Sequence, residues 1–241
     1  MKWRVGIQGA AGDLEHLARR FTKEPIQIDN DVDGHFLELD SFSGLTEASD
    51  VLAEGERVIK LLSGVVKLRR NSFEPLKAGH VTRVHPDGRR DAFVFIRESL
   101  TMRAELGEPT VTVSGPGPRP PAPPDPSVEL ASLGLKDRAV EDALRFFAHD
   151  ASDWVGLYRL YEVIEADAGG RIAVVSKGWS TDADIRRFKH TANSRSAIGD
   201  LARHGSESTQ PPKNPMRFEE ADAFIKGILQ AWLKEKNPFI T

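Results

Sequence analysis

The chain contains no cysteine, which excludes disulfide bonds, thiolate nucleophiles, zinc–thiolate sites and iron–sulfur clusters. No apolar run approaches the roughly 20 residues of a membrane-spanning helix, and the first residues lack the apolar stretch of a signal peptide. The net charge is only −3, so the chain as a whole does not attract nucleic acid. We therefore expect a cytoplasmic protein without a membrane segment, whose chemistry rests on histidine, carboxylates, hydroxyls, arginine or lysine.

The length of 241 residues fits two domains, because domains cluster near roughly 100 to 150 residues. With 39% hydrophobic and 29% charged residues, the composition is that of a globular protein. Seven of the fifteen prolines fall within residues 115–126. Because proline fixes φ and lacks an N–H, this stretch predicts a stiff polyproline II spacer. The sequence thus predicts a domain over residues 1–114, a linker over residues 115–127 and a second domain over residues 128–241.

The N-terminal part alternates between short strands and helices. Period-two runs predict strands over residues 2–8, 26–28, 36–39, 81–84, 92–96 and 110–113, and helical spacing predicts helices over residues 13–21 and 46–67. The pairs Asp33-Gly34 and Asp87-Gly88 are typical of hairpin turns. We expect an α+β domain in which an antiparallel sheet packs two helices against one face.

After the linker the apolar period changes to that of a helix. Apolar stripes predict helices over residues 140–147, 154–164, 185–189 and 218–232, which indicates an all-α bundle of four or five helices. Asp153 is the expected N-cap of the second of these helices, and Ser180 or Asp182 of the third. Arg171 to Ser176 is rich in β-branched residues and suggests an extended connector.

Two motifs in the N-terminal part resemble ligand sites. Gly6, Gly9 and Gly12 follow a strand and begin a helix, as in dinucleotide-binding folds, but the next strand turns back through a hairpin instead of continuing as βαβ units. The segment from Asp29 to Asp40 copies much of an EF-hand calcium loop, but strands flank it instead of helices. We interpret both as turns, with nucleotide or calcium binding as the minor alternative, and predict no cofactor and no metal.

Basic residues and histidines are most concentrated between Arg186 and His204. These nineteen residues hold five basic residues, two of the seven histidines and one acid, a local charge of +4. Basic side chains donate to phosphate, and a histidine among guanidiniums can act as general base on a ribose 2′-hydroxyl. The predicted catalytic residues are His204, Arg203, His190 and Asn193, and the predicted substrate-binding residues are Arg186, Arg187, Lys189 and Arg195.

The same residues also fit an ordinary helix end. In this interpretation Arg186, Arg187 and Lys189 form a solvated face, Asn193 and Ser194 cap helices, and Asp200 pairs with Arg203. Basic residues before a glycine are favourable at a helix C-terminus because they complement the helix dipole.

The run from about residue 137 to residue 236 resembles bacterial helical proteins of the HEPN type. The resemblance is carried by Asn193, Arg203, the pair His204-Gly205 and the amphipathic stretch from Phe218 to Trp232. The arginine-to-histidine spacing departs from that of active HEPN ribonucleases, since three residues separate Arg186 from His190 and eight separate Arg195 from His204. The resemblance implies a helical domain that dimerises, with its ribonuclease site either retained or lost.

Two functional hypotheses follow. The first is an RNA-binding protein or metal-independent endoribonuclease of a bacterial stress or phage-defence system, in which His204 or His190 is the general base. The alternative is a non-enzymatic ligand-sensing or protein-interaction module whose helical domain is structural.

Overall fold

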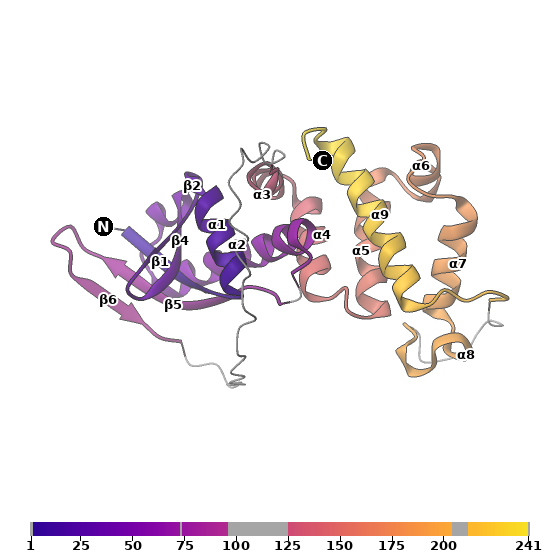
Figure 1. Ribbon diagram of the computed structural model, residues 1–241, viewed down its shortest axis with the longest axis horizontal. Helices are drawn as coiled ribbons and strands as arrows, with labels where there is room; N and C mark the ends of the chain where they lie inside the picture. The colour runs from indigo at the N-terminus through magenta and orange to yellow at the C-terminus, as the bar shows by residue number, and fades with distance from the viewer. Residues whose placement is uncertain (1, 73, 96–124, 204–211, 241) are drawn as a thin grey trace, which may run out of the picture.

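The computed structural model describes residues 2–72, 74–95, 125–203 and 212–240. These residues form an antiparallel sheet with helices and a helical C-terminal part, which confirms the predicted α+β class (Figure 1). The predicted strand over residues 110–113 and residues 115–124 of the predicted linker lie outside the described residues. None of the described helices combines the length and apolar character needed to span a bilayer.

The sheet has six strands in the order β2-β3-β4-β1-β5-β6, and every neighbouring pair is antiparallel. The strands are β1 (Lys2–Gln8), β2 (Thr22–Lys23), β3 (Ile26–Asp31), β4 (Gly34–Leu39), β5 (Lys77–Val84) and β6 (Arg90–Phe93). Both predicted hairpins are confirmed, and Gly34 and Gly88 adopt φ values of 104° and 84° in their turns. The antiparallel pairing of β1 differs from the parallel sheet of a dinucleotide-binding fold.

Two helices cover one face of this sheet, α1 (Ala11–Arg20) and α2 (Ala48–Arg70). Trp3, Val5 and Ile7 alternate along β1 and are buried on that face. Gly55 of α2 sits against the Val5 side chain, because a Cβ at Gly55 would lie 2.7 Å from Val5 Cγ2. A short 3-10 helix, η1 (Asp40–Gly44), leads from β4 toward α2.

The C-terminal part is helical. It contains α3 (Ser127–Lys136), α4 (Arg138–His149), α5 (Trp154–Ala168), α6 (Arg171–Ser176), α7 (Asp182–Asn193), α8 (Arg195–Ile198), the 3-10 helix η2 (Gly199–Leu201) and α9 (Phe218–Lys236). The predicted cap Asp153 is confirmed, since its side chain accepts a hydrogen bond from the Gly156 N–H at 2.8 Å.

Two local predictions in this part are wrong. Arg171 to Ser176 is helical, because Gly169 and Gly170, with φ values of 94° and 101°, end α5 and the next turn buries Val174 in the core. Here tertiary packing outweighs the weak strand preference of β-branched residues. The N-cap of α7 is Thr181, whose hydroxyl accepts from the Asp184 N–H at 3.1 Å, instead of Ser180 or Asp182.

Helix α2 lies between the sheet and the C-terminal helices (Figure 1). One side of α2 packs on the sheet, and the other contacts α3 and α4. At the α4 contact the helices approach closely, because a Cβ on Gly64 would lie 2.4 Å from the Leu144 carbonyl oxygen. Arg57 of α2 also pairs with Glu141 of α4 at 2.8 Å. A continuous hydrophobic core therefore runs from the sheet through α2 to α9.

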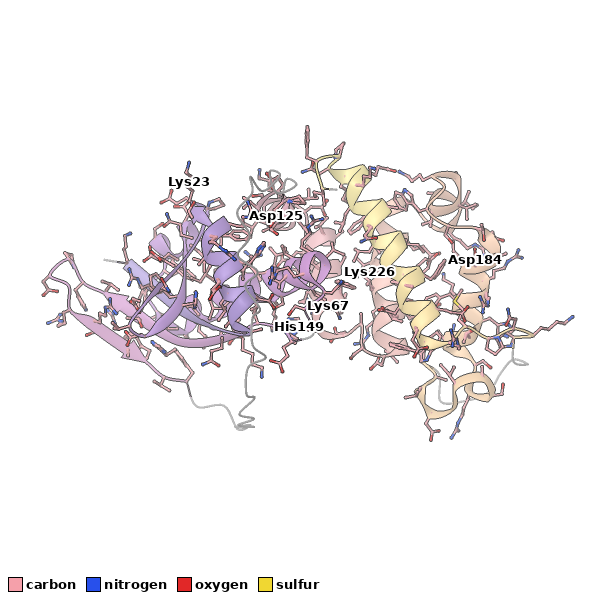
Figure 2. All side chains as sticks on the ribbon, in the orientation of Figure 1. Lys23, Lys67, Asp125, His149, Asp184 and Lys226 are labelled. Carbon is pink, nitrogen blue, oxygen red and sulfur yellow. The ribbon has the colours of Figure 1, made fainter. Side chains whose placement is uncertain are left out.

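Polar side chains border this junction. Lys67 of α2 and His149 of α4 lie close to each other there (Figure 2). Lys67 Nζ donates to the Phe147 carbonyl oxygen at 2.6 Å. Burial lowers the pKa of Lys67 and the pKa of His149, because desolvation penalises the charged form of each group.

Candidate functional site

Helix α7 carries most of the residues predicted to form a site. Thr181 caps its N-terminus, and Asp182 and Asp184 place negative charge in the first turn, where the helix dipole favours it. Figure 2 shows Asp184 at this end of the helix. Ile185, Phe188 and Ala192 face the core, so the basic residues between them are directed to other faces of α7.

The first two arginines of the segment are both paired within the chain. Arg186 is paired with Asp182 one turn earlier, at 2.8 Å, and its side chain is 66% exposed. Arg187 donates to the Asn214 carbonyl oxygen at 2.8 Å and pairs with Glu220 at 3.2 Å. The backbone hydrogen bond from Arg217 and the charge of Arg187 hold the pKa of Glu220 below its usual range. Arg187 therefore anchors the chain that leads into α9.

Lys189 is held by residues of α5. Its Nζ donates to both Glu165 oxygens, at 2.9 and 2.7 Å, and lies 4.9 Å from the centre of the Tyr161 ring. Burial raises the pKa of Tyr161, whose hydroxyl donates to Glu165 at 3.2 Å. This arrangement joins α7 to α5 across their interface.

His190 and Asn193 follow on α7. His190 is half-buried. Asn193 Nδ2 donates to the Lys189 carbonyl oxygen at 2.8 Å, while its Oδ1 is buried and accepts no hydrogen bond from the described residues. Asn193, the last residue of α7, thus bonds through its Nδ2 to its own helix.

Beyond α7, Arg195 pairs with Asp200 at 2.7 Å and keeps a side chain that is 53% exposed. Arg203 does not pair with Asp200 but with Glu162 of α5 at 3.1 Å, and its guanidinium lies 4.3 Å from the centre of the Tyr158 ring. The Arg203 N–H donates to the Ala192 carbonyl oxygen at 2.9 Å, which places Arg203 beside the end of α7. His204 lies outside the described residues.

The described part of the segment is therefore a set of ion pairs and helix ends. Arg186, Arg187, Lys189, Arg195 and Arg203 each have a carboxylate partner. Arg203 does lie beside the end of α7. None of the residues of this segment, however, lines any of the four cavities found among the described residues.

The largest of these four cavities has a volume of about 400 Å³ and lies where the sheet, η1 and the start of α2 meet. Its lining is Lys2, Trp3, Glu24, Gln27, Glu38, Leu39, Asp40, Phe42, Ser43, Leu45, Thr46 and Arg83. Trp3 Nε1 donates to the Leu45 carbonyl oxygen at 2.9 Å and fixes the loop before α2 against β1. The lining thus combines charged and polar side chains with the apolar side chains of Leu39, Phe42 and Leu45.

Sequence reasoning did not identify this cavity. The residue that could have indicated it is Arg83. This arginine stands at an inward position of the alternating strand Val81-Thr82-Arg83, where an apolar residue is expected. The sequence does not indicate that Asp40 and Glu24 line a cavity, because each is an ordinary carboxylate outside the predicted helices and strands. Only the folded sheet brings them to the same place.

The aspartates of the loop that resembles an EF-hand are used in ion pairs. Asp31 pairs with Arg4 at 3.3 Å and with Arg90 at 2.8 Å, and Arg90 also reaches Asp33 at 2.9 Å. The loop is the β3–β4 hairpin. Within the residues that the structure describes, no group of three or more His, Asp or Glu side chains is placed to hold a metal ion.

Comparison of the chain with protein-family models, with curated proteins and with solved structures finds no match. The functional interpretation therefore rests on the chain's own residues.

Proposed function

We propose that the chain is a non-enzymatic, small-ligand-sensing module in which the cavity beside η1 is the binding site and the helical part is a structural scaffold. The observation that carries the proposal is the contrast in side-chain pairing. The described cations of the Arg186–Arg203 segment all have a carboxylate within 3.2 Å, whereas the carboxylate paired with the Arg83 guanidinium in the cavity wall, Asp91, lies 3.9 Å away. An arginine that is only loosely paired in the wall of a cavity can bind a ligand.

A thermal-shift screen of the full chain against small anions, cations and zwitterions tests this proposal. At least one class is expected to raise the melting temperature of the wild type, because a ligand that binds only the folded state stabilises it. Thr46→Trp, which adds a large side chain to the cavity wall, is expected to abolish the shift. Ser49→Trp, three residues further along and exposed, is the matched control and should keep it. If no class shifts the wild type, the proposal fails.

RNA binding by the C-terminal part is a second candidate. It is favoured by Arg186 and Arg195, whose side chains remain 66% and 53% exposed although paired, and by the HEPN resemblance of this region. In this candidate the helical parts of two chains would form a homodimer and place two basic segments on one surface.

Filter binding of single-stranded RNA at several salt concentrations tests the second candidate. Arg186→Glu/Arg195→Glu is expected to weaken binding and to reduce its salt dependence, because phosphate contacts release counterions. Arg138→Glu on α4, at a side chain that is 71% exposed, is the matched control. Equal loss in both variants would indicate non-specific charge attraction and would remove this candidate.

A further inference from the structure

Arg83 has the donors of a binding residue and only a distant carboxylate, Asp91 at 3.9 Å, to pair with them. Its guanidinium lies 4.9 Å from the centre of the Trp3 ring and 5.2 Å from that of Phe93, so two aromatic rings fix its position. Its Nε is buried and has no hydrogen-bond partner among the described residues. The nearest carboxylate is Asp91 at 3.9 Å, beyond hydrogen-bonding distance.

Asp91 pairs more closely with His85 than with Arg83, although the Arg83 charge also lowers its pKa. His85 Nε2 lies 2.7 Å from its Oδ2, and the hydrogen bond with His85 holds the pKa of Asp91 below its usual range. A guanidinium offers a planar set of N–H donors that matches a carboxylate or phosphate. The Arg83 end of the cavity is therefore suited to an anionic group.

The other end of the cavity is suited to a cation. Glu24 and Asp40 are exposed, and their carboxylates form no ion pair with another described residue. Glu38 differs from them, because Arg4 binds it at 2.7 Å and Lys2 at 3.4 Å. A simple anion at Arg83 would leave the carboxylates of Asp40 and Glu24 unpaired at the other end, whereas a ligand that also carries a positive group would satisfy both ends.

The strand order sets the spacing between the two ends. Arg83 is on β5, and Asp40 directly follows β4, two strands away in the order β4-β1-β5. Neighbouring strands lie about 4.8 Å apart, so the two positions are separated by roughly 10 Å. Opposite charges on adjacent atoms cannot reach both ends, but charges joined by several methylene groups can. The apolar side chains of the lining, Leu39, Phe42 and Leu45, are suited to contact those methylene groups.

We infer that this cavity binds an elongated zwitterion, with a carboxylate or phosphate group at Arg83 and an ammonium or guanidinium group at Asp40 and Glu24. Basic amino acids and short peptides belong to this chemical class. The inference rests on the proposed ligand-sensing function and specifies its ligand.

Isothermal titration calorimetry on the full chain with four matched probes tests the inference. The probes are 6-aminohexanoate, which carries both charges at the ends of a methylene chain, hexanoate and hexylammonium, which carry one each, and glycine, whose charges are adjacent. We expect 6-aminohexanoate to bind at least about tenfold more tightly than any of the other three, because only it pairs at both ends.

Two variants test which charged group of the ligand binds at which end of the cavity. Arg83→Gln is expected to weaken 6-aminohexanoate binding about tenfold or more, and Asp40→Asn to weaken it by a smaller factor because Glu24 remains. Asp50→Asn, an exposed carboxylate in the first turn of α2 outside the cavity, is the control and should bind as the wild type does. Asp40 is exposed, so its variant remains informative if Arg83→Gln reduces folding.

The outcomes separate the inference from the proposed function. If hexanoate binds as tightly as 6-aminohexanoate and depends on Arg83 alone, the cavity is a simple anion site; the inference is then overturned and the sensing function stands. If none of the four probes binds but another class in the thermal-shift screen does, the inference alone is again overturned. If nothing in either experiment binds, both are overturned.

Discussion

Gly64→Ala is expected to lower the free energy of unfolding by about 3 kcal/mol, the upper part of the usual range for overpacking. The added Cβ would lie 2.4 Å from the Leu144 carbonyl oxygen, a backbone atom that cannot rotate away. Helices α2 and α4 must then separate, which opens the core between the sheet and the C-terminal helices. The melting temperature should fall by about 6 to 12 °C, measured by circular dichroism or calorimetry.

Gly227→Ala is the matched control for this experiment. Gly227 is also inside a helix, α9, but a Cβ there meets no atom within 4 Å. Because alanine is the better helix former, this variant should be more stable by about 0.5 to 1 kcal/mol. Equal changes in the two variants would mean that helix propensity, and not the α2–α4 contact, sets the effect at Gly64.

Phe188→Ala is expected to lower the free energy of unfolding by about 4 kcal/mol. Phe188 is fully buried, and its ring lies between 5.8 and 6.2 Å, centre to centre, from the rings of Trp154, Tyr158, Tyr161 and Phe224. Truncation would leave a cavity where α5, α7 and α9 meet. Chemical denaturation followed by near-UV circular dichroism measures both the lost stability and the lost aromatic packing.

The comparison for this variant is Phe239→Ala. Phe239 is 80% exposed near the C-terminus, so its truncation should change the free energy of unfolding by no more than about 0.5 kcal/mol. A small effect at Phe188 would contradict the description of its ring as the centre of the helical core.

The fold was largely predictable because its signals are local. The Asp-Gly pairs at Gly34 and Gly88 predicted both hairpins, and Asp153 predicted a helix start that the structure confirms. Helix α3 was not predicted, because it directly follows the proline-rich stretch and its short apolar pattern was not separated from that stretch. Helix α6 was predicted as extended because nothing local indicates that Val174 packs into the core.

The candidate site was less predictable, because charge density in a sequence does not show where partners lie. Arg203 finds Glu162 on α5, and Lys189 finds Glu165 on the same helix, although both acids precede the basic segment by more than twenty positions. Conversely, nothing within ten residues of Arg83 suggests that Asp40 lines the same cavity. Pairing of this kind is set by tertiary structure alone.

The position of α2 links the two ends of the molecule mechanically. Thr46 lines the cavity two residues before α2 begins, and Asn71, directly after its end, accepts a hydrogen bond from Lys226 of α9 at 2.7 Å. At Gly64, between these two ends, α2 packs directly against the backbone of α4. We therefore expect a displacement of the first turn of α2 to displace its contacts with α4 and α9 as well.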